Sequence, residues 1–332
     1  MMVFDKYILI TGGAGFIGSH LVRKFASNYE NYFIINLDKL TYASNISIIK
    51  DLEGKSNYLF IQGDICDVNL VHNLFDKFPI DSIIHLAAES HVDNSIKNPL
   101  AFINTNILGT VNLLEAARKY WINNSKHHLF YNISTDEVYG SLGEKGFFTE
   151  KSSYSPNSPY SASKASADHF VRAYGKTYNL NFIISNCSNN YGPHQHQEKL
   201  IPMTIKSIQE KKSIPIYGKG DSIRDWIFVL DHVNAIDIVF HNGKNGETYN
   251  IGSSNEMENI NLVEKICELI DEKMGIKKSK DLISFVSDRP GHDMRYAIDS
   301  SKIMNELNWE PKYSMSKGLK LTIDWYFSHP PG

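Results

Sequence analysis

Short apolar runs alternate with helix-length segments of mixed polarity through the first half of the chain. The runs cover residues 7–10, 32–37, 58–62, 82–86, 128–133 and 181–185. Runs that are apolar throughout are typical of parallel strands buried on both faces, and the segments between them predict successive βαβ units. The pattern therefore predicts an α/β fold, with a doubly wound parallel sheet covered by helices.

A glycine-rich turn joins the first apolar run to a predicted helix. Its sequence is TGGAGFIG, residues 11–18. Glycine allows a tight turn and lets the N–H groups at the helix N-terminus approach a pyrophosphate. Asp38 follows the second run, where a carboxylate accepts hydrogen bonds from both ribose hydroxyls of NAD and repels the 2′-phosphate of NADP. Because a strand and a helix flank the turn, we expect a Rossmann-type sheet that binds NAD rather than a plain structural turn.

The alternation becomes irregular beyond residue 186, where prolines and glycines interrupt it. We expect an NAD-binding domain over 1–188 and a smaller α/β domain over 189–332. Apolar runs at 224–229 and 248–251 predict strands that return to the main sheet. The boundary between the domains is therefore expected to be crossed more than once.

Two long helices are predicted in the first domain. Asn98 and Pro99 form a strong helix start, with a capping side chain before a proline at the first helical position. Apolar residues then recur at helical spacing and predict one continuous helix: Ile103, Ile107, Val111 and Leu114. The second long helix begins at Tyr160.

Composition narrows the class of protein. The chain has 332 residues, 42% hydrophobic and 21% charged, with a formal net charge of −3, so it lacks the basic field that nucleic acid requires. No room for a signal peptide precedes the first strand, and no apolar run is long enough to span a bilayer, so we expect a cytoplasmic protein without a membrane partner. Three distant cysteines without paired spacing argue against disulfide or zinc frameworks, and we expect no metal: Cys66, Cys187 and Cys267.

A tyrosine and a lysine are candidates for redox chemistry at a substrate hydroxyl. Tyr160 and Lys164 stand four apart, so both project from one face of the predicted helix. Tyrosine is a poor base at neutral pH, but a nearby ammonium stabilises the phenolate, which can take a hydroxyl proton while hydride leaves the same carbon. The pair also occurs in helices as packing with a solvated charge. The upstream NAD turn, and Ser134 and Thr135 at a strand end, favour the catalytic interpretation.

Two adjacent carboxyl groups follow Thr135 directly. An elimination needs one protonated carboxyl to release a hydroxyl as water and one ionised carboxylate to remove a proton from the neighbouring carbon. Asp136 and Glu137 provide this pair at the end of a predicted strand. The alternative is a solvated acidic turn, and the surrounding site favours elimination.

Four motifs together resemble the nucleotide-sugar 4,6-dehydratases, in the extended branch of the short-chain dehydrogenase/reductase superfamily. They are STDEVYG at 134–140, AAESHVD at 87–93, YSASK at 160–164 and RDW at 224–226. The resemblance extends from Ile8 to about Trp325 and is most similar to the members that act on dTDP-glucose. It implies oxidation at C4, loss of water across C5 and C6, and reduction at C6, giving dTDP-4-keto-6-deoxyglucose, a step toward deoxysugars such as rhamnose.

The resemblance also implies residue roles. Tyr160, supported by Lys164 and Thr135, deprotonates the 4-hydroxyl, Glu137 removes the C5 proton, and Asp136 protonates the departing 6-hydroxyl. NAD ends each cycle unchanged and stays bound. The implied cofactor contacts are Gly12, Gly15, Phe16, Ile17, Gly18, Asp38, Lys39, Leu40, Thr41, Asp64, Ile65, Leu86, Ala87, Ala88, Ser90, Thr105, Tyr160, Lys164 and Asn190.

The substrate contacts implied by the resemblance lie mostly in the smaller, substrate-binding domain. They are Ser90, His91, Thr135, Asn189, Lys199, Leu200, Pro215, Ile216, Tyr217, Arg224, Asn259, Asp288 and His292. Arg224 offers a forked donor and Lys199 a point charge to a diphosphate. Arg224 beside Asp225 is alternatively an internal salt bridge.

Three residues depart from the common family pattern, and alternatives remain open. Asn94 and Asn186 stand where arginine is frequent, and Met294 replaces a polar or basic residue. Asn94 leaves UDP-glucose as an alternative substrate. A nucleotide-sugar 4-epimerase would use the same tyrosine and lysine without the acidic pair. A non-catalytic NAD-sensing regulator would usually lack the tyrosine or the lysine.

The two long helices resemble those that pair across the family's dimer, so we expect a homodimer.

Overall fold

The computed structural model describes residues 4–122, 128–275 and 278–329. The chain divides into two compact units, which are treated separately below. The first comprises Met1–Val138, Ser158–Asn186 and Ile236–Tyr249, and the second comprises Tyr139–Asn157, Cys187–Ala235 and Asn250–Gly332.

A seven-stranded sheet forms the centre of the first unit, counted over the described residues, with the order β10-β6-β5-β4-β1-β2-β3. Strand β1 pairs in parallel with β2 and β4, β2 pairs in parallel with β3, and β4 pairs in parallel with β5. The strands are β1 Lys6–Thr11, β2 Tyr32–Asp38, β3 Tyr58–Gln62, β4 Ser82–His85, β5 Leu129–Thr135, β6 Phe182–Cys187 and β10 Thr248–Ile251. The six predicted strands and the Rossmann-type α/β fold are confirmed.

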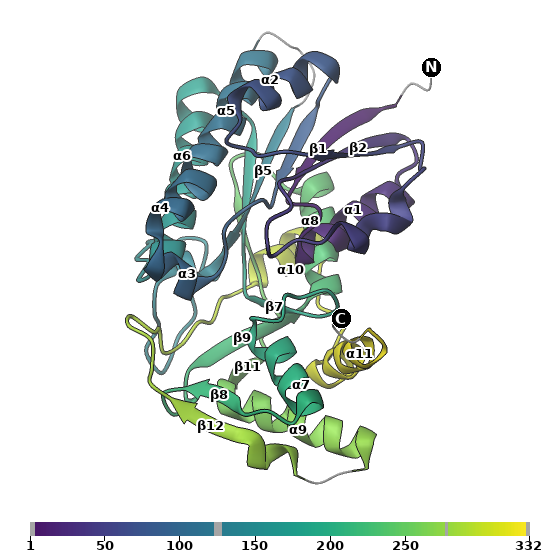
Figure 1. Ribbon diagram of the computed structural model, residues 1–332. Helices are drawn as coiled ribbons and strands as arrows, with labels where there is room; N and C mark the ends of the chain where they lie inside the picture. The colour runs from purple at the N-terminus through teal and green to yellow at the C-terminus, as the bar shows by residue number, and fades with distance from the viewer. Residues whose placement is uncertain (1–3, 123–127, 276–277, 330–332) are drawn as a thin grey trace. The chain divides into compact units, whose positions relative to one another are not determined.

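Helices cover both faces of this sheet, with α1 on the opposite face from α2, α5 and α6 (Figure 1). The helical segments are α1 Phe16–Asn28, η1 Ile46–Leu52, α2 Val68–Lys77, α3 Val92–Lys97, α4 Pro99–Phe102, η2 Ile103–Leu108, α5 Gly109–Trp121, η3 Asp136–Tyr139 and α6 Pro159–Tyr178. Apolar residues of β1, β2, α2, α5 and β5 form one buried cluster with part of α6. The cluster holds the strands and the helices together and so fixes the positions of the strand ends.

The helix predicted from Asn98 begins as expected at Pro99, but the apolar residues that predicted it do not all face the core. A π-helical turn, η2, separates α4 from α5, so Ile103 is 41% exposed while Asn106 and Thr110 are buried. A π-turn inserts one residue relative to α-helical spacing and rotates the inward face. Regular helical spacing therefore could not identify the buried positions.

The second unit holds two small sheets. The strands β7 Asn189–Tyr191, β9 Ile223–Phe228 and β11 Glu256–Glu258 form one sheet, and β8 Ile214–Tyr217 pairs with β12 Ile283–Val286. The prediction that the 224–229 run returns to the main sheet is wrong, whereas the 248–251 run does return as β10. Strand β10 lies at the edge beside β6, whereas β9 pairs with β7, in parallel, and with β11, antiparallel.

Helices α7, α9 and α11 pack around these sheets and share a buried apolar cluster. The remaining helical segments are α7 Leu200–Glu210, α8 Val229–Asn242, α9 Asn259–Met274, η4 Ser279–Leu282, α10 Ser301–Leu307 and α11 Met315–Ser328. Throughout the described part of the chain, no helix has both the length and the apolar character needed to cross a bilayer.

Candidate active site

The glycine turn folds tightly against the end of β4. Gly12 has φ +75°, and a Cβ there would lie 2.7 Å from the backbone nitrogen of Ala87. A Cβ on Gly18 would lie 2.1 Å from the carbonyl oxygen of Gly12, so helix α1 can approach the turn only without a side chain at that position. Gly15 is the N-cap of α1, and no side chain caps this helix end. The arrangement leaves a helix N-terminus suited to a pyrophosphate.

The carboxyl ends of β2 and β3 bring predicted cofactor residues together. Asp38 Oδ2 accepts a hydrogen bond from Ala14 N at 2.9 Å, and Oδ1 accepts one from Leu40 N at 2.8 Å. Each carboxylate oxygen has a second lone pair, so these bonds leave acceptor capacity for ribose hydroxyls. Lys39 Nζ lies 2.7 Å from Asp64 Oδ2. Burial acts to raise the pKa of Asp64, but Lys39 holds it below its usual value.

The segment after β4 packs on the glycine turn. Leu86 N donates to Thr11 O, and Ala87 N donates to Thr11 Oγ1, both at 3.2 Å. His91 caps α3, since its Nδ1 accepts a hydrogen bond from Asn94 N. Thus the turn, Asp38 and the predicted contacts Leu86 and Ala87 lie at the carboxyl edge of the sheet, where nucleotides bind in such folds. The residues present therefore fit NAD.

The five predicted catalytic residues all lie in the first unit. Thr135 ends β5, and Asp136 and Glu137 open the short helix η3. Thr135 Oγ1 donates to Asp136 Oδ1 and accepts from Glu137 N, each at 3.3 Å. Asp136 is 1% exposed and Glu137 is half-buried. The two carboxyl groups therefore have different surroundings, as an acid and a base require.

Helix α6 begins with a capping box and carries the tyrosine and lysine. Ser158 and Ser161 exchange side-chain hydrogen bonds to backbone N–H groups, and Pro159 occupies the first helical position. This start places Tyr160 in the first turn, and Lys164 follows one turn later on the same face. The buried Lys164 Nζ donates to Ile133 O at 2.8 Å, two residues before Thr135. This contact joins α6 to the end of β5.

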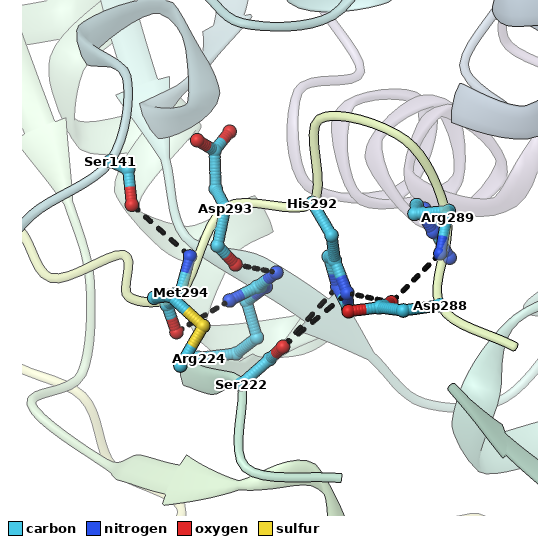
Figure 2. A network of polar contacts seen from close by, with 8 residues as sticks. All are labelled: Ser141, Ser222, Arg224, Asp288, Arg289, His292, Asp293 and Met294. Atoms are coloured by element: carbon cyan, nitrogen blue, oxygen red, sulfur yellow. Dashed lines mark hydrogen bonds and ion pairs between the residues drawn. The ribbon is translucent and has the colours of Figure 1, made fainter. Parts of the chain in front are cut away.

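The second unit places several predicted substrate residues around one network (Figure 2). Arg224 donates to three backbone carbonyl oxygens: Ile223 and Asp293, both at 2.8 Å, and Met294 at 3.3 Å. His292 points to Asp288, with Nδ1 2.7 Å from Oδ1. Burial lowers the pKa of His292, although Asp288 opposes the shift.

The alternative of a salt bridge between Arg224 and Asp225 is not supported by these contacts. Asp225 instead accepts hydrogen bonds from the backbone N–H groups of Ser253, at 3.1 Å, and Asn255, at 2.6 Å. Successive residues of a strand point to opposite faces, which separates the two side chains. Arg224 holds the 293–294 backbone, and it remains a proposed phosphate contact.

The other predicted contacts are distributed over several elements. Asn190 Oδ1 accepts from His232 Nδ1 at 2.8 Å, and its Nδ2 donates to Ser188 O, so its amide is fixed within the second unit. The rest are placed as follows: Phe16 and Ile17 at the start of α1, Thr41 after β2, Ile65 after β3, Ala88 and Ser90 after β4, Thr105 in η2, Asn189 in β7, Lys199 and Leu200 at the start of α7, Pro215, Ile216 and Tyr217 in β8, and Asn259 at the start of α9.

Sequence reasoning missed Asp168, which is fully buried on α6 and accepts hydrogen bonds from Asn132 and Ser134 of β5. Its position one turn after Lys164 gave no sufficient signal, because an acidic residue on a helix is usually solvated. Among the residues described, no group of three or more His, Cys, Asp or Glu is arranged to hold a metal ion.

Comparisons with known proteins identify the family. A family model described as GDP-mannose 4,6 dehydratase matches residues 9–322. The dTDP-glucose 4,6-dehydratase of Shigella flexneri is 51% identical, covering 97% of this chain and 93% of its own.

Solved structures agree with this assignment. The dTDP-glucose 4,6-dehydratase of Bacillus anthracis, in complex with NAD, has a TM-score of 0.87 at 46% identity and covers 98% of this chain and 97% of its own. The UDP-glucose 4-epimerase of Thermotoga maritima has a similar TM-score, 0.86, at only 28% identity, covering 98% of this chain and all of its own. The fold is therefore common to dehydratases and epimerases, whereas the higher sequence identity distinguishes the dehydratases from the epimerase. The chain belongs to the dTDP-glucose 4,6-dehydratase family.

Proposed function

We propose that this protein converts dTDP-glucose into dTDP-4-keto-6-deoxyglucose as an NAD-dependent hydro-lyase. The observation that carries the proposal is the acidic pair Asp136 and Glu137, adjacent to Thr135 at the strand end that Lys164 contacts. A 4-epimerase needs the tyrosine and lysine but has no use for an acid and base at C5 and C6. The family relationship to dTDP-glucose 4,6-dehydratases supports the same choice.

NAD, when bound, supplies one chemical function: it accepts a hydride from C4 of the sugar and returns it to C6. The residues that would hold it are the glycine turn, through the N-terminus of α1, and Asp38, through its remaining acceptor capacity. The contacts of Leu86 and Ala87 with Thr11 fix the neighbouring segment.

Oxidation at C4 requires removal of a hydroxyl proton. The ammonium of Lys164 stabilises Tyr160 as a phenolate, and this phenolate takes the hydroxyl proton and becomes a neutral phenol. Thr135 supports this step by turning its single hydroxyl proton from Asp136 Oδ1 to the substrate hydroxyl, which it then orients. Lys164 is held by Ile133 O, so its charge is fixed beside the strand end.

Elimination then requires a base and an acid on neighbouring carbons. Glu137 removes the C5 proton, which the adjacent ketone has made acidic, and its partial exposure favours the ionised form. Asp136 gives its proton to the 6-hydroxyl, which leaves as water. Burial of Asp136 favours the protonated carboxyl that this role needs.

The second unit supplies the proposed contacts to the nucleotide diphosphate, among them Arg224, Lys199 and the 288–292 loop. A homodimer is part of the proposal. Its support is a group of exposed apolar side chains on α4, η2 and α6, including Leu100 at 67% exposed, Leu108 at 55% and Phe170 at 41%. Exposed apolar side chains on neighbouring helices favour association with a second copy of the chain, because association removes them from water.

The test is incubation with dTDP-glucose and UDP-glucose in separate reactions. A 4-keto-6-deoxy sugar is detected by its absorbance in alkali, and we expect it with dTDP-glucose. Equal product from UDP-glucose would favour the alternative substrate, which Asn94 leaves open. Recovery of an epimerised sugar without the keto product would contradict the dehydratase assignment.

A further inference from the structure

Helix α6 presents a buried polar face to β5 beyond the catalytic pair. Asp168 lies one helical turn after Lys164 and is fully buried. Its Oδ1 accepts a hydrogen bond from Asn132 Nδ2 at 2.7 Å, and its Oδ2 accepts one from Ser134 Oγ at 2.8 Å. No step of the proposed reaction uses Asp168 directly, so the burial of an ionisable group there needs another explanation.

The geometry of these contacts fixes the last residues of β5. Asn132 and Ser134 are two apart in the strand, so their side chains point to the same face, toward α6. Lys164 contacts the carbonyl oxygen of Ile133 between them. Three consecutive residues of β5 are thus tied to α6 immediately before Thr135.

A carboxylate suits this position because it is an acceptor with two oxygens. It receives the amide of Asn132 and the hydroxyl of Ser134 at once, as charge-assisted hydrogen bonds. Burial of a charged group carries a desolvation penalty, which burial of an apolar side chain of similar volume does not. An apolar contact would therefore hold the helix against the strand at least as stably. The polar arrangement is therefore explained better by the orientation it imposes than by stability.

We propose that Asp168 is a positioning residue for the reaction. Its hydrogen bonds to Asn132 and Ser134 fix the end of β5 against α6. They thereby fix the position of Asp136 and Glu137, which follow β5, relative to Tyr160 on α6. The inference rests on the proposed function, because it concerns the geometry of that reaction.

Loss of this restraint affects chemistry more than substrate binding. A displacement of reacting groups by about 1 Å can reduce a rate on the order of 100-fold. The proposed nucleotide contacts of the second unit are untouched by a change at Ser134 or Asp168. We therefore expect kcat to fall while KM stays within about threefold, the signature of interactions that act in the transition state.

The experiment compares three variants of the full-length protein. Ser134→Ala removes one donor to Asp168, and Asp168→Asn keeps the size of the side chain but removes its charge. Ser185→Ala is the matched control, because Ser185 is a fully buried serine of β6 whose hydroxyl bonds to Tyr131 at 3.1 Å. Each variant is assayed for kcat, KM, Tm and the kinetic isotope effect with dTDP-glucose deuterated at C5.

The proposal predicts that Ser134→Ala lowers kcat about tenfold and Asp168→Asn lowers it further, with a larger C5 isotope effect in both. Ser185→Ala should lower Tm by a similar amount to Ser134→Ala but keep the parent kcat and isotope effect. If Ser134→Ala instead behaves as Ser185→Ala does, Asp168 is only structural and the proposal is wrong. Ser134→Ala decides the matter even if Asp168→Asn fails to fold. Failure of the parent to form the keto sugar would instead refute the proposed function.

Discussion

Replacing Gly12 with alanine tests the geometry of the nucleotide turn. Its φ of +75° lies in the left-handed region, which costs a non-glycine residue about 1–2 kcal/mol. The new Cβ would lie 2.7 Å from Ala87 N, 2.8 Å from Ala87 Cα and 3.0 Å from the carbonyl carbon of Leu86. All three atoms belong to the backbone, so relief requires movement of the segment after β4, at roughly 1–3 kcal/mol. We expect Gly12→Ala to destabilise the first unit by about 2–5 kcal/mol.

Gly15→Ala provides the matched control within the same turn. The backbone of Gly15 is extended, at φ −82° and ψ −179°, and a Cβ would contact only Gly12 O, at 3.3 Å. The free energy of unfolding of the Gly15→Ala variant should therefore stay within about 1 kcal/mol of the parent value. The added methyl group nevertheless stands at the N-terminus of α1, where the pyrophosphate of NAD approaches the backbone, so NAD affinity should fall.

Thermal unfolding by circular dichroism, with and without NAD, separates these effects. Gly12→Ala should lower Tm by roughly 5–15 °C without NAD. Gly15→Ala should match the parent Tm without NAD but show a smaller rise when NAD is added. If Gly12→Ala unfolded at the parent temperature, the close approach of the turn to Ala87 would not constrain the fold as argued.

Three further predictions concern the base, the cofactor preference and pH. Glu137→Gln should stop formation of the keto product while reduced cofactor still appears on mixing with substrate, and product at the parent rate would refute Glu137 as the base. Asp38→Asn should weaken NAD binding about tenfold and raise NADP binding relative to NAD, measured by titration calorimetry; an unchanged preference would exclude the ribose contact. Burial lowers the pKa of His85 and of His232 to about 3, so below pH 6.5 the unfolded chain binds protons that the folded chain does not. Each histidine should then cost about 2 kcal/mol of stability by pH 5, so Tm should fall between pH 7 and pH 5, less steeply in His232→Gln; equal slopes would contradict this account.

Local patterns predicted the nucleotide half of the fold well. The turn at 11–18 and the first strands depend on neighbouring residues, since apolar runs specify buried strands and glycines specify the turn. The five catalytic candidates also fall in one unit, because the carboxyl end of β5 and the first turn of α6 are adjacent in this topology. Their roles remain proposals.

Features that depend on packing between distant segments could not be read from the sequence. The π-turn η2 shifts the inward face to Asn106, which interrupts the apolar spacing without any local signal. The pairing of β9 with β7 joins segments more than 30 residues apart, which a local apolar run does not specify. The role of Asp168 became visible only through its contacts with β5, because an acidic residue on a helix is usually solvated.

The central claim is that the hydride removed at C4 is the one returned to C6 within the same active site. The most direct measurement is conversion of dTDP-glucose deuterated at C4, with the product analysed by mass spectrometry and NMR. The account predicts a 4-keto sugar that keeps one deuterium, located in the C6 methyl group. Loss of the deuterium to solvent, or its return to C4 in an epimerised sugar, would contradict it.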